Sequence, residues 1–258
     1  MLRFRNLGSG STGNATVVEA TGPSGVTRLL VDCGLQPRQL DQRLSLAGLA
    51  GDAINAIFIT HEHGDHIGCA QAFSRRHRIP VWMSHGTHSA LGSPDFDTPL
   101  CCARDGVPIL LSELQLMPFT VPHDAREPLQ LVCSDGEVRL GILTDLGHAS
   151  SHVQQQLSGC HALLLECNHD LALLAESRYP EFLKQRIAGR LGHLSNLQAA
   201  DLLRSLVHPG LRQVVAAHLS ERNNRPELAQ QAMGQALGQS TAAIGVAHPE
   251  HGTGWIEV

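Results

Sequence analysis

The stretch AIFITHEHGDH, residues 56–66, decides how this chain folds and where its chemistry lies. Its first five residues are apolar or β-branched, which predicts a buried strand. Residues i and i+2 of an extended chain point to the same side, so His61 and His63 can bind one metal ion together. The glycine that follows lets the chain turn, and Asp65 and His66 can then reach a second ion. We interpret HxHxDH as a metal-binding motif, because a chance occurrence in this composition has a probability of roughly 3 in 1,000.

Further metal-ligand side chains occur where other predicted strands end. His123 follows an apolar strand, Asp145 ends the run Leu140–Thr144, and His218 ends the run Val214–Ala217. A carboxylate can bridge two cations, whereas an imidazole fills a single position. Each residue alone is compatible with an ordinary hydrogen-bonded loop. Together with the HxHxDH motif, they are expected to complete a metal centre.

Short β-like runs alternate with helical runs along the whole chain. Strands are predicted at Met1–Arg5, Ala15–Ala20, Val26–Val31, Ala56–Thr60, Val81–Met83, Glu113–Phe119, Leu129–Cys133, Val138–Thr144, Ala162–Glu166, Gln213–Ala217, Ala242–Val246 and Gly254–Val258. Helices are predicted at Pro37–Leu46, Ile67–Arg76, Pro180–Arg190 and Leu197–Val207, and from Pro226 onwards. This order predicts an α/β layered domain and fits neither a helical bundle nor an all-β barrel.

Composition excludes several classes of protein. The 258 residues carry a formal net charge of −5, so a basic nucleic-acid coat is excluded. No apolar run approaches the ~18–20 residues of a membrane span, and the first residues lack the apolar core of a secretion signal. The seven cysteines are odd in number and have no CxxC spacing, which favours reduced thiols. We therefore expect a cytoplasmic protein without a membrane partner.

A nucleic acid would need local groups of cations. The sequence offers three: Arg75, Arg76 and Arg78; Lys184, Arg186 and Arg190; and Arg222 with Arg225. Arginine forks suit phosphate, although solvated surface arginines explain these groups equally well.

The ligand motifs resemble those of the metallo-β-lactamase superfamily, and the resemblance spans nearly the whole chain. It includes the segments 8–14, 32–35, 166–170, 192–196 and 218–224. The narrower GHLSN and HLSERNN motifs resemble the YycJ/WalJ branch of bacterial DNA exonucleases, which is related to tRNase Z. The resemblance implies a four-layer αββα sandwich in one domain, residues 1–258, with two similar halves. Only 48 positions separate Asp145 from His193, too few for an inserted β-CASP domain.

The resemblance also implies a centre of two divalent metal ions, zinc or manganese, with iron also compatible with such ligands. The implied ligands are His61, His63 and His123 for one ion, Asp65, His66 and His218 for the other, and Asp145 as the bridge. A bridging hydroxide would be the nucleophile of a phosphodiester hydrolysis. Asp65 would also act catalytically, by orienting that hydroxide or accepting its proton.

An in-line displacement needs a proton for the leaving oxygen. His193, in the GHLSN motif, is the expected general acid, because the resembling segment of tRNase Z carries a histidine with this proposed role. His148 and His169 are rivals, and a purely structural role for His193 at the helix start is the alternative.

Four residues are expected to contact the substrate. Ser11 and Asn14 lie in the Gly- and Ser-rich loop 8–14, whose amides can face a phosphate. A plain hairpin turn explains that loop equally well. Asn168 and Asn223 are expected to bind a backbone phosphate or sugar.

These observations together predict a dinuclear metal-dependent phosphodiesterase, a DNA exonuclease that degrades its strand from 5′ to 3′. One alternative is a hydrolase of small esters, lactones or β-lactams on the same fold, because fold and metals do not fix the substrate. Another is a non-catalytic binding module, against which the complete set of seven ligands argues. A narrow apolar pocket would favour a small substrate, and an open groove bordered by arginines would favour a polynucleotide.

Overall fold

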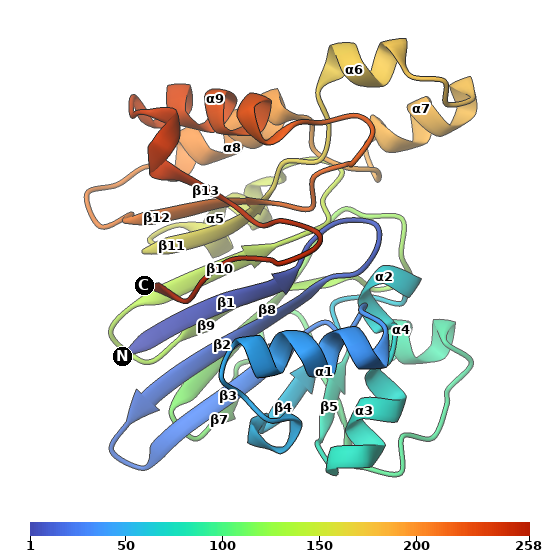
Figure 1. Ribbon diagram of the computed structural model, residues 1–258, viewed down its shortest axis with the longest axis vertical. Helices are drawn as coiled ribbons and strands as arrows, with labels where there is room; N and C mark the ends of the chain where they lie inside the picture. The colour runs from blue at the N-terminus through green and yellow to red at the C-terminus, as the bar shows by residue number, and fades with distance from the viewer.

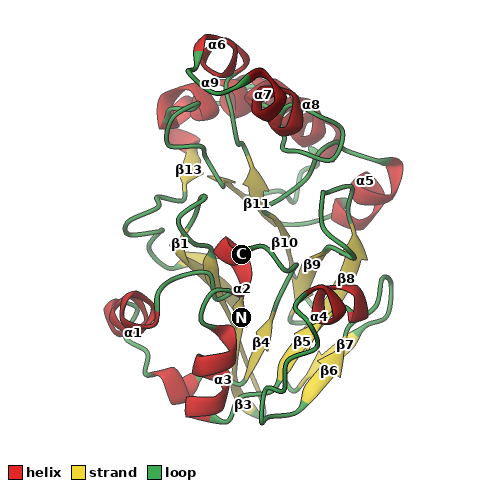
Figure 2. Ribbon diagram, turned by 90° about the vertical axis from the view of Figure 1, so that its right-hand side faces the viewer, coloured by secondary structure: helices red, strands yellow, loops and turns green.

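The computed structural model describes residues 1–258 and contains two stacked β-sheets with helices on both outer faces (Figure 1). Each sheet has seven strands. Figure 2 faces one edge of the two sheets and shows the helices outside them. The predicted four-layer αββα sandwich is therefore confirmed.

The first sheet has the order β14-β1-β2-β3-β4-β5-β6. Its strands are β1 (Leu2–Gly8), β2 (Ala15–Gly22), β3 (Gly25–Val31), β4 (Ala56–Phe58), β5 (Val81–Met83), β6 (Leu100–Cys102) and β14 (Ile256–Glu257). The helices of this half are α1 (Pro37–Leu46), α2 (Gly64–Ile67), α3 (Ala70–His77), α4 (His85–Ala90) and the short η1 (Gly51–Ala53).

The second sheet has the order β13-β12-β11-β10-β9-β8-β7. Its strands are β7 (Ile109–Leu111), β8 (Leu114–Thr120), β9 (Leu129–Ser134), β10 (Arg139–Leu143), β11 (Ala162–Glu166), β12 (Gln213–Ala217) and β13 (Ile244–Val246). The helices of this half are α5 (Ser151–Leu157), α6 (Leu171–Glu176), α7 (Glu181–Ile187), α8 (Asn196–Leu206), α9 (Pro226–Leu237) and the short η2 (Thr241–Ala243).

Strand direction decides where the functional loops lie. The strands β3 to β6 pair in parallel in the first sheet, as do β10 to β13 in the second. The strand β8 runs in the direction of β10, because both pair antiparallel with β9. The carboxyl ends of β4, β8, β10 and β12, which precede the predicted ligands, are therefore free to meet at one edge.

Three apolar clusters hold the four layers together. The central cluster joins the sheets and draws Phe4 and Phe58 from the first and Leu116 and Ile142 from the second. A second cluster packs α5, α8 and α9 on one sheet, and a third packs α1 and α3 on the other. Because the central cluster belongs to both halves, we propose that residues 1–258 form a single domain. The segment between Asp145 and His193 holds only α5, β11, α6 and α7.

The predicted helix Ile67–Arg76 is wrong as a continuous element. The chain forms two helices, α2 and α3, and Gly68 lies between them with φ 32°. A Cβ atom at Gly68 would lie 2.4 Å from the carbonyl oxygen of Cys33, so the close approach of the chain at this point requires glycine.

Several short elements were not predicted: the strands β6 and β7 and the helices α4, α5 and α6. The helix predicted to reach Arg190 ends at Ile187. No helix in the structure combines the length and the apolar character needed to cross a membrane.

Candidate metal centre

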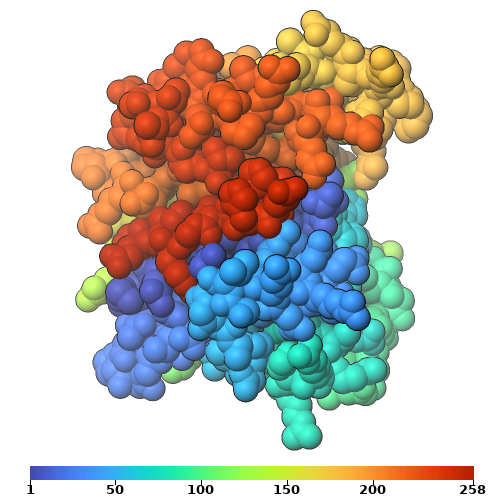
Figure 3. All heavy atoms as spheres, viewed as in Figure 1, coloured from blue at the N-terminus to red at the C-terminus, as the bar shows by residue number.

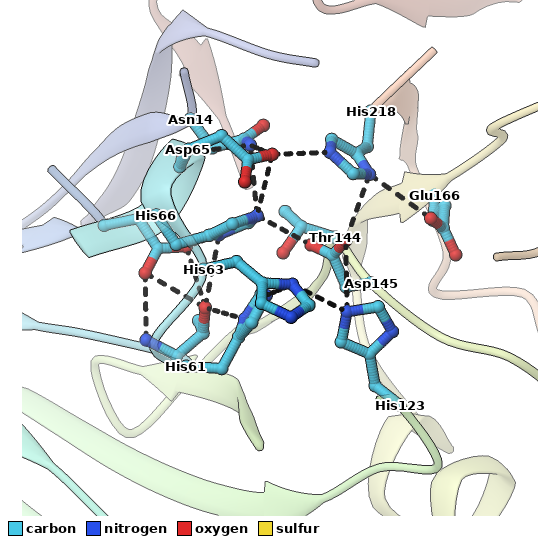
Figure 4. A network of polar contacts seen from close by, with 12 residues as sticks. Asn14, His61, His63, Asp65, His66, His123, Thr144, Asp145, Glu166 and His218 are labelled. Carbon is cyan, nitrogen blue, oxygen red and sulfur yellow. Dashed lines mark hydrogen bonds and ion pairs between the residues drawn. The ribbon is translucent and has the colours of Figure 1, made fainter. Parts of the chain in front are cut away.

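The seven predicted ligands meet at the carboxyl edge of both sheets. Figure 4 shows their side chains pointing toward one another from the segments that follow β4, β8, β10 and β12, with Asp65 and His66 on α2. Five of them, His61, His66, His123, Asp145 and His218, are buried, and His63 and Asp65 are partly exposed. Residues far apart in the sequence therefore form one compact cluster of donors.

Three imidazoles form the first group. The Nδ1 atom of His63 lies 3.0 Å from Nε2 of His61 and 3.4 Å from Nε2 of His123. All three ligand atoms lie within 4.8 Å of one another. Three nitrogen lone pairs directed at one point suit a divalent cation of the zinc type.

The second group consists of Asp65, His66 and His218. The Oδ2 atom of Asp65 lies 3.6 Å from Nε2 of His66 and 3.5 Å from Nε2 of His218. This set also falls within 4.8 Å. One carboxylate and two imidazoles again form a donor set that suits a divalent transition metal.

Asp145 lies between the two groups. Its Oδ2 atom is 3.0 Å from Nε2 of His66, and its Oδ1 atom is 3.8 Å from Nε2 of His123. The carboxylate is buried, and Oδ2 accepts no hydrogen bond of good geometry. A buried unpaired carboxylate oxygen is costly unless a cation or donor satisfies it, so the donor set fits bound divalent metal ions.

Buried partners fix the orientation of the ligand rings. Asp32 accepts from Nδ1 of His66 at 2.7 Å, and the hydroxyl of Thr60 lies 3.0 Å from Nδ1 of His61. The same hydroxyl donates to Asp32 at 3.0 Å. Because these contacts occupy Nδ1, each ring presents Nε2 to the centre.

The ligand histidines after β8 and β12 are oriented in the same way, through a contact of Nδ1. Nδ1 of His123 lies 3.1 Å from the carbonyl oxygen of Gly192, and Nδ1 of His218 lies 3.3 Å from Glu166. His218 also has a left-handed backbone, φ 53°, and its amide donates to the hydroxyl of Ser9 at 2.7 Å.

The pKa values of the ligand histidines His61 and His218 are shifted in opposite directions. Burial lowers the pKa of His61 well below its ordinary value, which keeps that imidazole neutral as a metal ligand requires. Burial also disfavours the charged form of His218, but Asp145, Asp65 and Glu166 outweigh it and raise its pKa to about 10. A metal ion bound among these carboxylates would take over the role of the proton on His218.

The donors open into a polar cavity of about 370 Å³. Only two of its lining residues, Leu183 and Ile187, are apolar. Arg186 and the imidazole of His193 also line the cavity, together with the carboxylates of Asp65, Asp124 and Asp145. The scarcity of apolar groups argues against a small apolar substrate. Because three carboxylates face one arginine, the positive charge for an anionic substrate would come from bound metal ions.

His193 lines this cavity, as expected of a proton donor. Its Nδ1 atom lies 2.7 Å from Oε1 of Glu166 and 3.5 Å from Oδ1 of Asp145. Burial lowers the pKa of His193, but the two carboxylates raise it above its ordinary value. Glu166 is fully buried and is itself held by the amides of Leu146 and Leu194.

The two rival histidines do not line the cavity. His148 is partly exposed, with its Nδ1 atom 2.9 Å from the carbonyl oxygen of Arg190. His169 is buried, and neither of its ring nitrogens has a hydrogen-bond partner. Burial lowers the pKa of His169 to about 4, so its ring is neutral.

Of the four residues expected to contact the substrate, one lines the cavity and three are buried and hydrogen-bonded within the chain. Ser11 lines the cavity. Asn14 is buried, and its side-chain nitrogen Nδ2 donates to the carbonyl oxygen of Asp65 at 3.2 Å. Asn168 donates to the carbonyl oxygen of His218 at 3.0 Å, and the side chain of Asn223 lies 3.3 Å from the hydroxyl of Ser220. The three asparagines therefore hold the loops that carry the ligands.

The sequence reasoning did not identify Asp32, Thr60 or Glu166 as functional. Asp32 and Glu166 lie within segments that carry the family resemblance, and Thr60 directly precedes the HxHxDH motif, but no local pattern shows that their side chains reach a ligand. Gly34 is a fourth such residue, because a Cβ atom there would lie 1.7 Å from the carbonyl oxygen of Asp65. The loop after β3 thus packs directly against the HxHxDH segment.

Comparisons with known proteins agree with this geometry. Residues 8–164 match the family model of the metallo-beta-lactamase superfamily. The chain is 31% identical over 256 residues to exodeoxyribonuclease YycJ of Bacillus anthracis, covering 98% of this chain and 95% of that protein. It is 28% identical over 249 residues to exodeoxyribonuclease WalJ of Streptococcus pneumoniae, covering 95% and 91%.

The fold has close counterparts among solved structures. The metallo-beta-lactamase fold protein YhfI of Bacillus subtilis superposes with a TM-score of 0.77 at 14% identity, over 100% of both chains. The family model covers more than half of the chain, and the sequence relatives cover nearly all of it. The chain therefore belongs to the metallo-beta-lactamase superfamily.

Proposed function

We propose that this protein is a metal-dependent nuclease, a dinuclear phosphodiesterase that degrades DNA from the 5′ end. The observation that carries the proposal is the arrangement of seven donors in two groups joined by Asp145, with His193 facing the same cavity. Two relatives similar over nearly the whole chain are named exodeoxyribonucleases, which supports DNA as the substrate.

The donor set supports one assignment of the metal ligands. His61, His63 and His123 would hold one divalent ion, Asp65, His66 and His218 a second, and Asp145 both. Imidazole and carboxylate donors without thiolate suit zinc or manganese, with iron also compatible. When bound, such ions neutralise phosphate charge and supply an activated hydroxide at neutral pH.

The chain's own residues perform the proton transfers. Asp65, partly exposed to the cavity, accepts the proton of the attacking water. His193 donates the proton that the leaving oxygen requires, from Nε2, since Nδ1 is bound to Glu166. The carboxylate of Glu166 stabilises the charged form of His193 until that transfer.

Hydrolysis of a small ester, lactone or β-lactam is the second candidate on this fold. The cavity contains few apolar side chains and includes Arg186. Small-substrate pockets are lined mainly by apolar groups, so this lining favours the nuclease. A purely non-catalytic role would leave the buried ligand cluster without a purpose.

The decisive experiment is digestion of end-labelled single- and double-stranded DNA and RNA with manganese, zinc or a chelator. Wild type is compared with Asp65→Ala, His193→Ala and the surface control Asp41→Ala. Asp41 makes an exposed ion pair with Arg76, away from the centre. We expect metal-dependent release of 5′-label as a short product, progressive shortening of 3′-labelled DNA, and loss of cleavage in Asp65→Ala.

Two results would overturn the proposal. One is wild-type protein that cleaves no polynucleotide with any of these metals yet hydrolyses a small ester. The other is Asp65→Ala protein that retains full cleavage and full metal content.

A further inference from the structure

Residues 171–190, which we call the arm, contain the helices α6 and α7 and lie beside the metal cavity. The arm projects at one corner of the molecule, on the side where α2 lies (Figure 1), and stands out in gold in the space-filling view (Figure 3). Leu183, Arg186 and Ile187 of α7 line the cavity itself. The arm therefore borders the route by which a long substrate reaches the centre.

The arm carries an aromatic side chain that the fold does not use. The chain has six phenylalanines, and five of them are buried: Phe4, Phe58, Phe73, Phe96 and Phe119. The sixth, Phe182 in α7, is 72% exposed. Single exposed apolar side chains are common on protein surfaces. What distinguishes Phe182 is that its exposed ring lies on α7, the helix that lines the cavity, where it is available for a contact outside the chain.

Phe182 and Arg186 form one surface. They are four residues apart in α7, so they lie on the same face, about 6 Å apart along the helix axis. Successive nucleotides of a strand are ~3.4 Å apart along the duplex axis. A strand with its scissile phosphate at the metals and a phosphate at Arg186 would place a neighbouring base against Phe182.

The charge of the arm favours an anionic partner. It carries four cations, Arg178, Lys184, Arg186 and Arg190, against two acids, although the whole chain has a net charge of −5. Arg186 is held at 2.6 Å from Asp124 through Nε alone. Its two terminal nitrogens remain available for a phosphate.

One contact within the arm and one with the rest of the chain order it. The ammonium group of Lys184 in α7 donates to the carbonyl oxygen of Ala175 at the end of α6. The guanidinium of Arg222, in the loop after β12, lies 5.9 Å from the ring centroid of Tyr179 between the two helices. A surface that is already ordered loses less entropy on binding than a flexible one.

We propose that the arm is the binding surface for the single strand next to the scissile phosphate, with Phe182 stacking on a base and Arg186 contacting a backbone phosphate. This inference rests on the proposed nuclease function. Stacking on an aromatic ring tolerates any base, which suits an enzyme that advances along a strand. In a blunt duplex the bases are already stacked and paired, so the surface selects unpaired ends.

The test compares kcat/KM for a single-stranded oligonucleotide with kcat/KM for bis(4-nitrophenyl) phosphate, which is too small to reach Phe182. In Phe182→Ala we expect the ratio of the two constants to fall about 10-fold through the KM of the oligonucleotide, and Phe182→Trp should restore it. The control Leu110→Ala removes an apolar side chain that is 74% exposed on β7 and should leave the ratio unchanged.

Salt dependence isolates the phosphate contact. In Arg186→Ala the slope of log affinity against log salt should fall by about 0.7, as for one phosphate contact to a single strand, and Phe182→Ala should keep the slope. The matched control is Arg204→Ala, because Arg204 on α8 is about as exposed as Arg186 and pairs with Asp201 at the same distance, 2.6 Å. This control should leave unchanged both the slope of log affinity against log salt and the ratio of the two kcat/KM values.

The possible failures are distinguishable. If wild-type protein cleaves no polynucleotide, the nuclease proposal itself is wrong. If wild type cleaves DNA and Phe182→Ala has the wild-type ratio, the inference about the arm is overturned. If Phe182→Ala instead converts an oligomer to a monomer, with no change of ratio, Phe182 belongs to a contact between subunits and the inference is likewise overturned.

Discussion

The Nδ1 atom of His193 lies 2.7 Å from Oε1 of the buried carboxylate of Glu166, although 27 positions separate the two residues. This contact fixes which ring nitrogen faces the cavity and favours the protonated ring. A histidine that must donate a proton at neutral pH needs such a partner, since burial alone would remove its charge.

Removal of the ring should affect poor leaving groups most. We expect His193→Ala to lower kcat on DNA about 100- to 10,000-fold, because the departing sugar oxygen needs a proton. Hydrolysis of bis(4-nitrophenyl) phosphate, whose leaving group is a stable phenolate, should fall far less. Equal losses on both substrates, with unchanged metal content, would mean that His193 does not act as an acid.

Removal of the partner charge should move the pH profile. The carboxylate of Glu166 raises the pKa of His193, so Glu166→Gln should lower that pKa. The acid form of His193 exists below its pKa. The alkaline limb of kcat against pH should therefore move to lower pH, and the loss relative to wild type should be larger at pH 9 than at pH 6. A uniform loss at every pH would assign Glu166 a purely structural role.

Asp32 should control metal affinity without touching the metal. It accepts from Nδ1 of His66 at 2.7 Å and has a left-handed backbone, φ 61°, which asparagine tolerates. Asp32→Asn should therefore fold and bind manganese or zinc about 10- to 100-fold more weakly at one site. Calorimetric titration measures this, with Asp41→Asn as the surface control. Wild-type affinity at both sites would contradict the assignment.

Gly34 should be intolerant of any side chain. A methyl group there would lie 1.7 Å from the carbonyl oxygen of Asp65 and 2.8 Å from the amide of Asn14. We expect Gly34→Ala to destabilise the fold by about 1–3 kcal/mol, a fall of ~2–4 °C in Tm per kcal/mol. Gly254→Ala, at a position with no neighbour within 4 Å, is the control in a thermal melt. An unchanged Tm in Gly34→Ala would show that the two loops separate easily.

The central motif and the layered fold were predictable because their signals are local. An apolar strand followed by alternating histidines specifies both the buried element and the direction of its side chains. Strand ends supplied the remaining ligands, since parallel strands finish at one edge. The short helices α4, α5 and α6 also had a local signal, which the prediction did not use. Each begins after a side-chain cap, Ser84, Ser150 or Asp170.

The roles proposed for Asp32, Glu166 and Phe182 could not be predicted from the sequence, for a physical reason. The roles of the first two depend on partners 34 and 27 positions away, which only the packed sheets bring within hydrogen-bond distance. Phe182 resembles any core residue in a helical pattern, and only the structure shows that its ring is exposed. Similarly, Asn14 and Asn168 are polar loop residues in the sequence, and their burial appears only in the fold.

The left-handed backbone of His218 bears on the evolutionary record of this fold. A residue with a Cβ atom in that conformation costs up to roughly 1–2 kcal/mol, and less for asparagine, aspartate and histidine, which occur there more often. Selection for stability alone would favour glycine at such a position, and a requirement for the imidazole as a metal ligand would oppose that replacement. If His218 is a metal ligand, we expect proteins of this fold that lack the metal centre to carry glycine or asparagine at this position more often than proteins that keep it.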